Sequence, residues 1–427
     1  MTRGSRTMNG KQSLLGNIPD GLTTAYLTSL IVLVSVYFSF HFVTLCREHP
    51  GSAARVDLLS GFAAWDGEHY VRIVNEGYSW HPERMSNVAF FPAYPALAAT
   101  VKRLTGCRAE VALLLVNYAA LIGCFVLLGS DTRERAGENQ PHLAGFTLLA
   151  LGLWPTSFWM RMCYTESLFL LLTLSAMLSM RRNAHPLTVA LIIGLATATR
   201  ATGVALIPVF GLWLWRGDLN SLFKNNAPDS ATGRNFGRAT MLGLAYLPVM
   251  LWGLIGYMAW LNHRFGDPLV FMQTQIHWTA SPVHGFLDNV IRLVTLEPVR
   301  AVYNSADPGY WGRVPPHDHP LLNLQFANPI FFGVTVILLV LGIRRRWINA
   351  GELMLAAGLL GIAIWFQGVR ANMMSQARYA SVVYPVYMVL GHLLSRVPPM
   401  VAALLCACSA VMLAAYTAMF SAWYFFY

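Results

Sequence analysis

Runs of predominantly apolar residues recur along the whole sequence, each bounded by a short polar segment. A helix needs about 20 apolar residues to cross a bilayer, so we count about eleven candidate spans. A soluble domain would also carry roughly twice the charged fraction of this chain, which is 12% of 427 residues against 56% hydrophobic, with a mean hydropathy of +0.48. The sequence therefore predicts an all-α polytopic membrane protein. The spans are approximately Leu22–Leu45, Glu110–Leu128, His142–Met162, Ser167–Met180, Pro186–Thr199, Val204–Trp215, Met241–Trp260, Asn328–Ile343, Leu353–Phe366, Ser381–Leu394 and Val401–Phe425.

Basic residues between these runs indicate how the chain threads the membrane, because short cytoplasmic loops accumulate Lys and Arg. An N-terminus on the cytoplasmic side makes the threading self-consistent. It leaves Phe91–Leu104 as an interfacial or re-entrant helix rather than a span. The long polar segments 46–108 and 263–325 then lie on the outer face, and we expect residues 1–427 to form one integral domain. The clusters placed inside are Arg133 with Arg135, Arg181 with Arg182, 216–238, Arg344–Arg346 and Arg396.

Several classes of function are disfavoured. The formal net charge is +10, but the basic residues form short clusters rather than one continuous face, so we expect no nucleic-acid partner. The cysteines lack metal-ligand spacing, although a Cys46–Cys107 disulfide is a minor alternative. The candidate acids are dispersed and phosphate-binding glycine patterns are missing, so we expect neither a metal nor a cofactor. We also expect no cleavable signal peptide, because the first apolar run is long enough to span.

The sharpest polar motif is Trp65-Asp66-Gly67-Glu68-His69-Tyr70, in the first outer segment. If 66–75 is helical, Asp66 and His69 share one face, and Glu68 can pair with Arg72 on another. Asp66 lies in an outer loop next to the membrane, and we expect it to act as a general base. It would deprotonate the hydroxyl group of an acceptor molecule as that oxygen attacks a sugar. The alternative for Asp66 is a helix cap. For His69 a satisfied structural histidine competes with a role in holding Asp66 or a phosphate.

Two other polar sites interrupt apolar sequence. Tyr164-Thr165-Glu166 precedes a predicted span, where Glu166 is either a site residue or a favourable acid at a helix N-terminus. Arg200 lies in Thr199–Gly203 between two short runs, which are either two helices or one long helix holding a buried arginine. A mid-membrane arginine costs about 2.5 to 3.5 kcal/mol, so Arg200 marks an outer turn or an anionic partner. A lipid phosphate fits the planar arginine fork, and a loop arginine among headgroups is the alternative.

Further candidate site residues lie closer to the C-terminus. Gln275, His277 and Trp278 lie in the second outer segment, and the Arg378-Tyr379 pair opens a predicted span. Arg378 and Tyr379, together with Arg200, are candidates for binding the phosphate and lipid of a lipid-phosphate sugar that donates the sugar. An interfacial Arg-Tyr pair is also a common membrane anchor. The remaining candidate substrate-binding residues are Trp65, Tyr70, Tyr164 and Glu166.

These motifs together resemble the PIG-V family, the second mannosyltransferase of GPI-anchor assembly and its bacterial relatives. The family pattern WDxxHF/Y, then GY and AFFPxxP, is matched by residues of the first outer segment. Weaker matches follow in the family's order: Tyr164-Thr165-Glu166, Thr199–Gly203 and Arg378-Tyr379. The matching residues of the first pattern are Trp65, Asp66, His69, Tyr70, Gly77, Tyr78, Ala89, Phe90, Phe91, Pro92 and Pro95.

The resemblance implies a GT-C glycosyltransferase fold. It further implies a polyprenyl or dolichyl phosphate sugar as donor, a lipid-linked or glycan acceptor, Asp66 as the base, and transfer with inversion. The residues alone leave two other classes open. One is a lipid or sugar-lipid flippase, because an outer face rich in arginine and aromatic residues also suits a carrier. The other is a non-catalytic subunit. Compact loops and the missing Lys-rich retrieval signal favour a bacterial cytoplasmic membrane over the endoplasmic reticulum.

Overall fold

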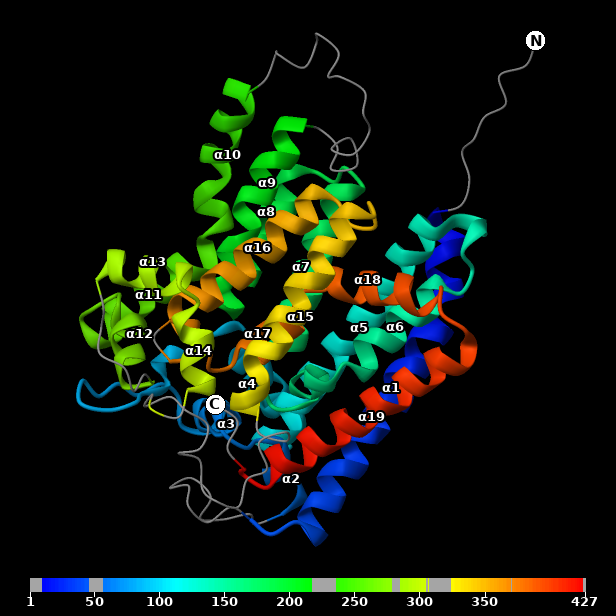
Figure 1. Cartoon of the computed structure of the whole chain (residues 1–427). Helices are drawn as coiled ribbons and strands as arrows, with labels where there is room; N and C mark the ends of the chain where they lie inside the picture. Colours follow the sequence, from blue (N-terminus) through cyan, green and yellow to red (C-terminus); the bar gives the residue numbers. More distant parts are fainter. Residues whose placement is uncertain are drawn as a thin grey trace.

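The computed structural model describes residues 10–45, 57–216, 236–278, 285–304, 306, 324–369 and 371–424. Helices make up all the regular structure of these described ranges (Figure 1). The predicted all-α fold class is therefore confirmed. Cys46 of the minor disulfide alternative lies outside the described residues.

Five helical segments are long and apolar enough to cross a membrane, and the number rises to seven if two bent helix pairs each count as one span. The eleven predicted spans are thus not confirmed as a count, although each corresponds to a helical segment. The longest helices are α1 (Gly10–Phe42), α5 (Ala109–Ala136), α15 (Leu324–Arg344), α16 (Ala350–Ala363, continued by the π-helix Ile364–Gly368) and α19 (Pro399–Ser421).

Several predicted spans are interrupted. The run His142–Met162 divides into α6 (Leu143–Leu153) and the 3-10 helix η3 (Pro155–Arg161), with a bend of 78° at the proline. The run Met241–Trp260 divides into α10 (Phe236–Met250) and α11 (Trp252–Phe265), with a bend of 43° close to Pro248. Proline cannot donate the helical hydrogen bond and clashes with the preceding turn, which explains both positions.

Arg200 lies at a third interruption. The helix α8 (Pro186–Thr199) ends directly before it, and η4 (Ala201–Ala205) and α9 (Leu206–Arg216) follow. The alternative of one long helix through Arg200 is therefore wrong. Close to the C-terminus, a short α17 (Gln376–Ser381) similarly precedes α18 (Pro385–Leu394). These breaks place polar side chains at helix ends inside the bundle.

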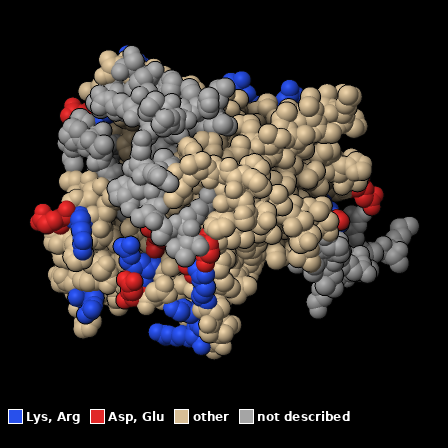
Figure 2. All heavy atoms as spheres, turned by 90° about the horizontal axis from the view of Figure 1, so that it is seen from below, with Lys and Arg blue, Asp and Glu red and all other residues tan. Residues whose placement is uncertain are grey.

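The outer surface carries many large apolar side chains, as lipid contact requires. On α1, Tyr26, Leu27, Val34 and Phe42 are exposed, and on α19 so are Met400 and Val411. Figure 2 views the molecule from below and shows charged side chains gathered on the left. A wide area without them lies in the centre and right of centre, up to a few charged side chains at the right edge. The surface thus agrees with an integral membrane protein.

The bundle has two distinct polar ends. The helix α7 (Glu166–Arg181) packs along α5, and its 16 residues separate those ends by about 24 Å. At its last turn Arg181 pairs with Asp131 and Glu134 of α5, beside Arg182. At the other end α2 (Leu58–Phe62), α3 (Asp66–Glu76) and α4 (Ala93–Thr105) pack against α5. In Figure 1 these three helices lie at the bottom of the molecule.

The second polar segment forms short elements in its described part. They are α12 (Val270–Gln273), η7 (Thr274–Trp278), α13 (Phe286–Val294) and α14 (Glu297–Tyr303). Thr274 accepts a hydrogen bond from the backbone N–H of Ser86, just before the 3-10 turn η1 (Asn87–Ala89). The two long polar segments are thus in contact, as their expected placement on one face requires.

Candidate active site

Asp66 occupies the first position of α3, directly after a residue with an unusual backbone. Trp65 has φ 60° and ψ −125°, a region that non-glycine residues rarely adopt. Such a conformation costs about 1–3 kcal/mol and persists only where the surroundings enforce it. Here the indole of Trp65 packs against that of Trp423, with ring centroids 5.3 Å apart. The predicted helix over 66–75 is confirmed.

The side chain of Asp66 is engaged by an arginine that is distant in sequence. Its Oδ2 accepts a hydrogen bond of 2.5 Å from Nη1 of Arg378. Asp66 is therefore not bonded as a helix cap; Trp65 occupies the N-cap position, without a side-chain capping bond. The Asp66 side chain is 26% exposed, so a bound hydroxyl group can reach it.

Glu166 connects this pair to a second arginine. Its Oε1 accepts 2.5 Å from Nε of Arg378 and 2.7 Å from Nη1 of Arg200. The carboxylate is fully buried, and its other oxygen, Oε2, has no hydrogen-bond partner in the described structure. Asp66, Arg378, Glu166 and Arg200 thus form one continuous ionic chain of two acids and two bases.

Tyrosine rings flank both guanidinium groups. The Arg378 Cζ lies 4.4 Å from the ring centroid of Tyr164, and the Arg200 Cζ lies 5.3 Å from that of Tyr379. Tyr164 also donates its hydroxyl to the carbonyl of Ala64 at 3.1 Å. These cation–π contacts and the ionic chain fix the orientation of both arginines. At 8% exposure, Arg378 is buried, so the membrane-anchor alternative for Arg378-Tyr379 is wrong.

His69 and Tyr70 support the motif from the interior side of α3. The imidazole of His69 stacks on Phe90 at 4.9 Å, and the ring of Tyr70 packs edge-on against Phe90 and Tyr94. Burial lowers the pKa of His69, while the nearby Asp66 opposes that shift. A neutral imidazole is thereby favoured next to Asp66.

One expected contact is missing. Glu68 and Arg72 do not reach ion-pair distance in the described structure, so the predicted pair is wrong. The four-residue spacing permits the pair, but both side chains are exposed, and an exposed ion pair gains at most about 1 kcal/mol.

Gln275 and His277 lie in another part of the outer region. The Nε2 of His277 is 2.7 Å from the carbonyl oxygen of Pro82. Neither residue forms a hydrogen bond or ion pair with the Asp66–Arg200 chain in the described ranges, and Trp278 ends the same short helix η7. Gln275 and His277 are thus not joined to the ionic chain, and the side chain of Trp278 lies outside the described part of the structure.

Three buried charged residues, Arg161, Asp131 and Glu352, were not found from the sequence. Arg161 is completely buried in η3, and its guanidinium donates to Ser29, Thr28, Ser157 and the carbonyl of Gly152. Asp131 and Glu352 are buried in the second polar end. The cost of a charge inside an apolar run, which drew attention to Arg200, is the signal that could have found them.

Within the described residues, no group of three or more His, Cys, Asp and Glu side chains is arranged to hold a metal ion. The chemistry that this part of the structure offers is a partly accessible carboxylate beside two fixed guanidinium groups. Such an arrangement can accept a proton at one point and bind an anion at another.

Comparison with known proteins gives the family context. Residues 25–227 match the family model described as Mannosyltransferase (PIG-V). This range contains the Trp65–Tyr70 motif, Tyr164–Glu166 and Arg200. The resemblance to PIG-V mannosyltransferases is confirmed.

Curated proteins with similar sequences are also mannosyltransferases. The human protein named GPI alpha-1,6-mannosyltransferase 2 is 32% identical over 157 residues, which are 35% of this chain and 31% of the human protein. Its Cricetulus griseus counterpart is 31% identical over the same shares. The match thus spans about a third of the length of the curated PIG-V relatives.

Two solved structures cover most of the chain at low identity. ArnT from Cupriavidus metallidurans bound to undecaprenyl phosphate has a TM-score of 0.46 and 16% identity, covering 90% of this chain and 63% of ArnT. The Archaeoglobus fulgidus oligosaccharyltransferase has a TM-score of 0.46 and 14% identity, covering 95% of this chain and 56% of the other.

Proposed function

We propose that this chain is a membrane glycosyltransferase of the GT-C class. It transfers a hexose, mannose in the first place, from a polyprenyl or dolichyl phosphate sugar to a lipid-linked or glycan acceptor. The transfer takes place on the non-cytoplasmic face, in a bacterial cytoplasmic membrane rather than the endoplasmic reticulum. The observation that carries the proposal is the ionic chain Asp66–Arg378–Glu166–Arg200, of which Asp66, Glu166 and Arg200 lie within the range that matches the family model.

Asp66 and the guanidinium groups of the ionic chain have different roles in this reaction. Asp66 accepts the proton of the acceptor hydroxyl as that oxygen attacks the anomeric carbon. The bond between the anomeric carbon and the phosphate oxygen breaks, and the polyprenyl phosphate leaves with increased negative charge. Fixed guanidinium groups stabilise that charge more effectively than water does. Arginine has five N–H donors, and Arg378 uses Nε and Nη1 within the chain, which leaves donors for a phosphate oxygen.

The Arg378–Asp66 bond has a consequence for the order of events. While it persists, Oδ2 of Asp66 is occupied by a hydrogen bond from Nη1 of Arg378. A donor phosphate that competes for Arg378 would release Asp66. Donor binding thus frees the Asp66 carboxylate to meet the acceptor hydroxyl.

The direct test uses the purified full chain in liposomes with polyprenyl phosphate [¹⁴C]mannose and a membrane lipid extract as acceptor pool. We expect label in a new covalent product, little product from polyprenyl phosphate glucose, and an unchanged rate with EDTA. Arg378→Lys keeps the charge but cannot form both bonds of the fork, so we expect transfer to fall at least about tenfold. Label that crosses the bilayer without covalent transfer would support a flippase instead.

A further inference from the structure

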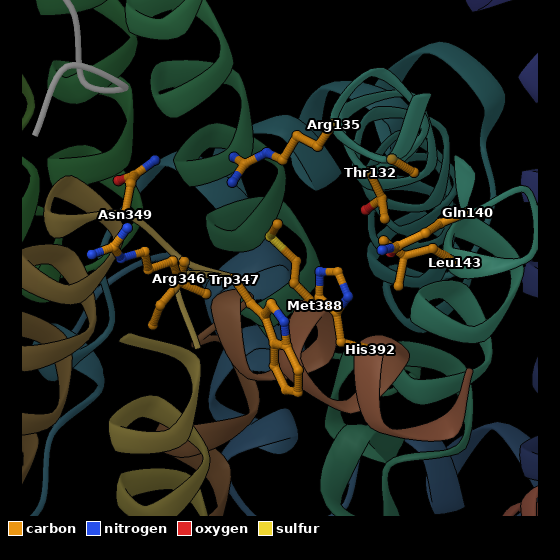
Figure 3. Close-up of a pocket in the computed structure, with 11 residues that line it drawn as sticks. Thr132, Arg135, Gln140, Leu143, Arg346, Trp347, Asn349, Met388 and His392 are labelled. Atoms are coloured by element: carbon orange, nitrogen blue, oxygen red, sulfur yellow. The ribbon is translucent and has the colours of Figure 1, made fainter. Parts of the chain in front are cut away.

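A cavity of about 320 Å³ lies at the polar end opposite Asp66. It opens between α5, α6, the turn joining α15 to α16, and α18. Figure 3 shows Arg346 and Gln140 on opposite sides of it, with Met388, Trp347 and His392 between them. The size is that of a site for a small molecule rather than for a single ion.

The carboxylates beside this cavity are already neutralised. Arg135 pairs with Asp131 at 2.9 Å and with Glu352 at 2.5 Å, and Arg181 also pairs with Asp131. Tyr384 donates its hydroxyl to Glu352 at 3.1 Å, and Glu352 closes the capping box of α16. These acids are held by interior partners and leave little negative charge for the cavity itself.

Positive charge on the cavity side is not balanced in the same way. Arg346 lines the cavity and, within the described residues, has no ion pair with a carboxylate. Arg396 lies over the Trp347 ring at 4.5 Å, and its Nη1 donates to the carbonyl of His392 at 2.7 Å. It likewise has no carboxylate partner in the described ranges. The mouth of the cavity therefore carries an excess of guanidinium charge.

The polar lining also contains unsatisfied groups. The Nε of Arg135 and the Oε1 of Gln140 are buried without a hydrogen-bond partner in the described structure. Buried polar atoms without partners are uncommon in folded proteins and each one calls for an explanation. A polar cavity of this size holds water or a ligand rather than remaining empty.

We propose that this cavity binds the phosphate group of a glycerophosphate-type ester, at the membrane face opposite the proposed active site. Phosphate oxygens accept from arginine forks, and the buried Oε1 of Gln140 can accept a hydrogen bond from a hydroxyl group of the attached ester. The cavity exceeds what inorganic phosphate fills, and Trp347 and Met388 offer apolar surface to an attached carbon skeleton. The ligand is either the headgroup of an anionic lipid or a soluble phosphate ester, because both present the same group. The inference does not depend on the proposed function.

Binding to the purified full chain distinguishes these two sources. One arm measures soluble glycerol 3-phosphate by equilibrium dialysis in detergent. The other measures retention of labelled phosphatidylglycerol in nanodiscs that otherwise contain phosphatidylcholine. Saturable binding in the first arm assigns the site to a soluble ester, and selective retention in the second assigns it to a lipid. Absence of saturable binding in both arms overturns the proposal.

Matched variants locate the binding. Arg346→Gln removes the cavity charge, and we expect affinity to fall at least about tenfold, since charge-assisted hydrogen bonds are lost. Arg345→Gln is the control, because Arg345 is an exposed arginine in the same turn that does not line the cavity, and we expect less than about twofold change. Gln140→Ala, in a surface segment, is the second variant should Arg346→Gln not fold. Equal losses for Arg345 and Arg346 would mean general surface charge and contradict the site.

Discussion

Glu166 balances the charge of the proposed active site, because a single oxygen of its buried carboxylate accepts from both Arg200 and Arg378. Each of these arginines alone would be expensive to hold among apolar helices. Together with Asp66 they make two positive and two negative charges. Glu166 thus holds the two guanidinium groups close to each other despite their repulsion.

Replacing Glu166 by Gln keeps its shape and removes its charge. We expect the variant to lose about 3–5 kcal/mol of stability, since two buried guanidinium groups lose their shared partner. Thermal unfolding in detergent measures this. Glu110→Gln is the control, because Glu110 also lies in the first turn of a helix and pairs with an arginine, Arg108, that is 51% exposed. A surface pair of this kind contributes at most about 1 kcal/mol, and equal losses for the two variants would refute the role of Glu166.

The sequence identified the four residues of the ionic chain but not the hydrogen bonds and ion pairs that join them. Asp66 was found from its motif, and Arg200 from the cost of a charge in an apolar run. Arg378 bonds to residues 212 and 312 positions away, and no local pattern carries that information. Glu166 was accordingly grouped with substrate contacts, whereas its bonds are to the two arginines.

Among the helices, α8 and α11 approach each other closely enough for backbone contact, and this packing positions Arg200 at the end of α8. A Cβ atom on Gly253 of α11 would overlap with the carbonyl oxygen of Gly194 and the backbone of Ala198, both in α8. Small residues at such crossings let membrane helices pack tightly. Gly253 is therefore required by the approach of the two helices.

Gly253→Ala should force α8 and α11 apart. We expect a loss of at least about 1–3 kcal/mol in stability from overpacking, together with reduced transfer activity because Arg200 moves. Gly256→Ala lies in the same helix, and a Cβ there meets nothing within 4 Å. We expect that control to be neutral or slightly stabilising. Unfolding temperatures and transfer rates of the two variants, measured side by side, test the contact; matching values would argue against it.

Helix positions were largely predictable. The expected Pro186–Thr199 coincides with α8, whereas the interruption at Arg200 was one of two alternatives that its charge left open. Helix interruptions at Trp154 and Leu251 were not foreseen, although Pro155 and Pro248 provide a local cause. The number of spans could not be settled, because broken and short helices do not meet a simple length criterion.

At the scale of the whole molecule, the proposed function places the two polar ends on opposite sides of the membrane. The ionic chain with Asp66 lies at one end of α7, and the arginine-rich cavity lies at the other. The basic clusters that set the predicted threading, among them Arg135, Arg181 and Arg346, belong to the cavity end. If these clusters lie on the cytoplasmic side, as the threading predicts, the proposed active site faces away from the cytoplasm.

Cysteine labelling tests this orientation. In a background with all six cysteines replaced by alanine, Glu83→Cys and Glu138→Cys provide one exposed position at each end. We expect a membrane-impermeant maleimide to label Cys at position 83 in intact cells, and position 138 only after the membrane is opened. The reverse pattern would place the Asp66 end in the cytoplasm.

The central claim is that Asp66 is the base for sugar transfer, and Asp66→Asn tests it most directly. Asparagine keeps the size of the side chain and its bond to Arg378 but cannot take up the acceptor proton. Transfer from saturating polyprenyl phosphate mannose should fall by about 10²–10⁴-fold, with donor binding and unfolding temperature close to those of the unmodified chain. A variant that binds donor normally and transfers mannose at an undiminished rate would contradict the account.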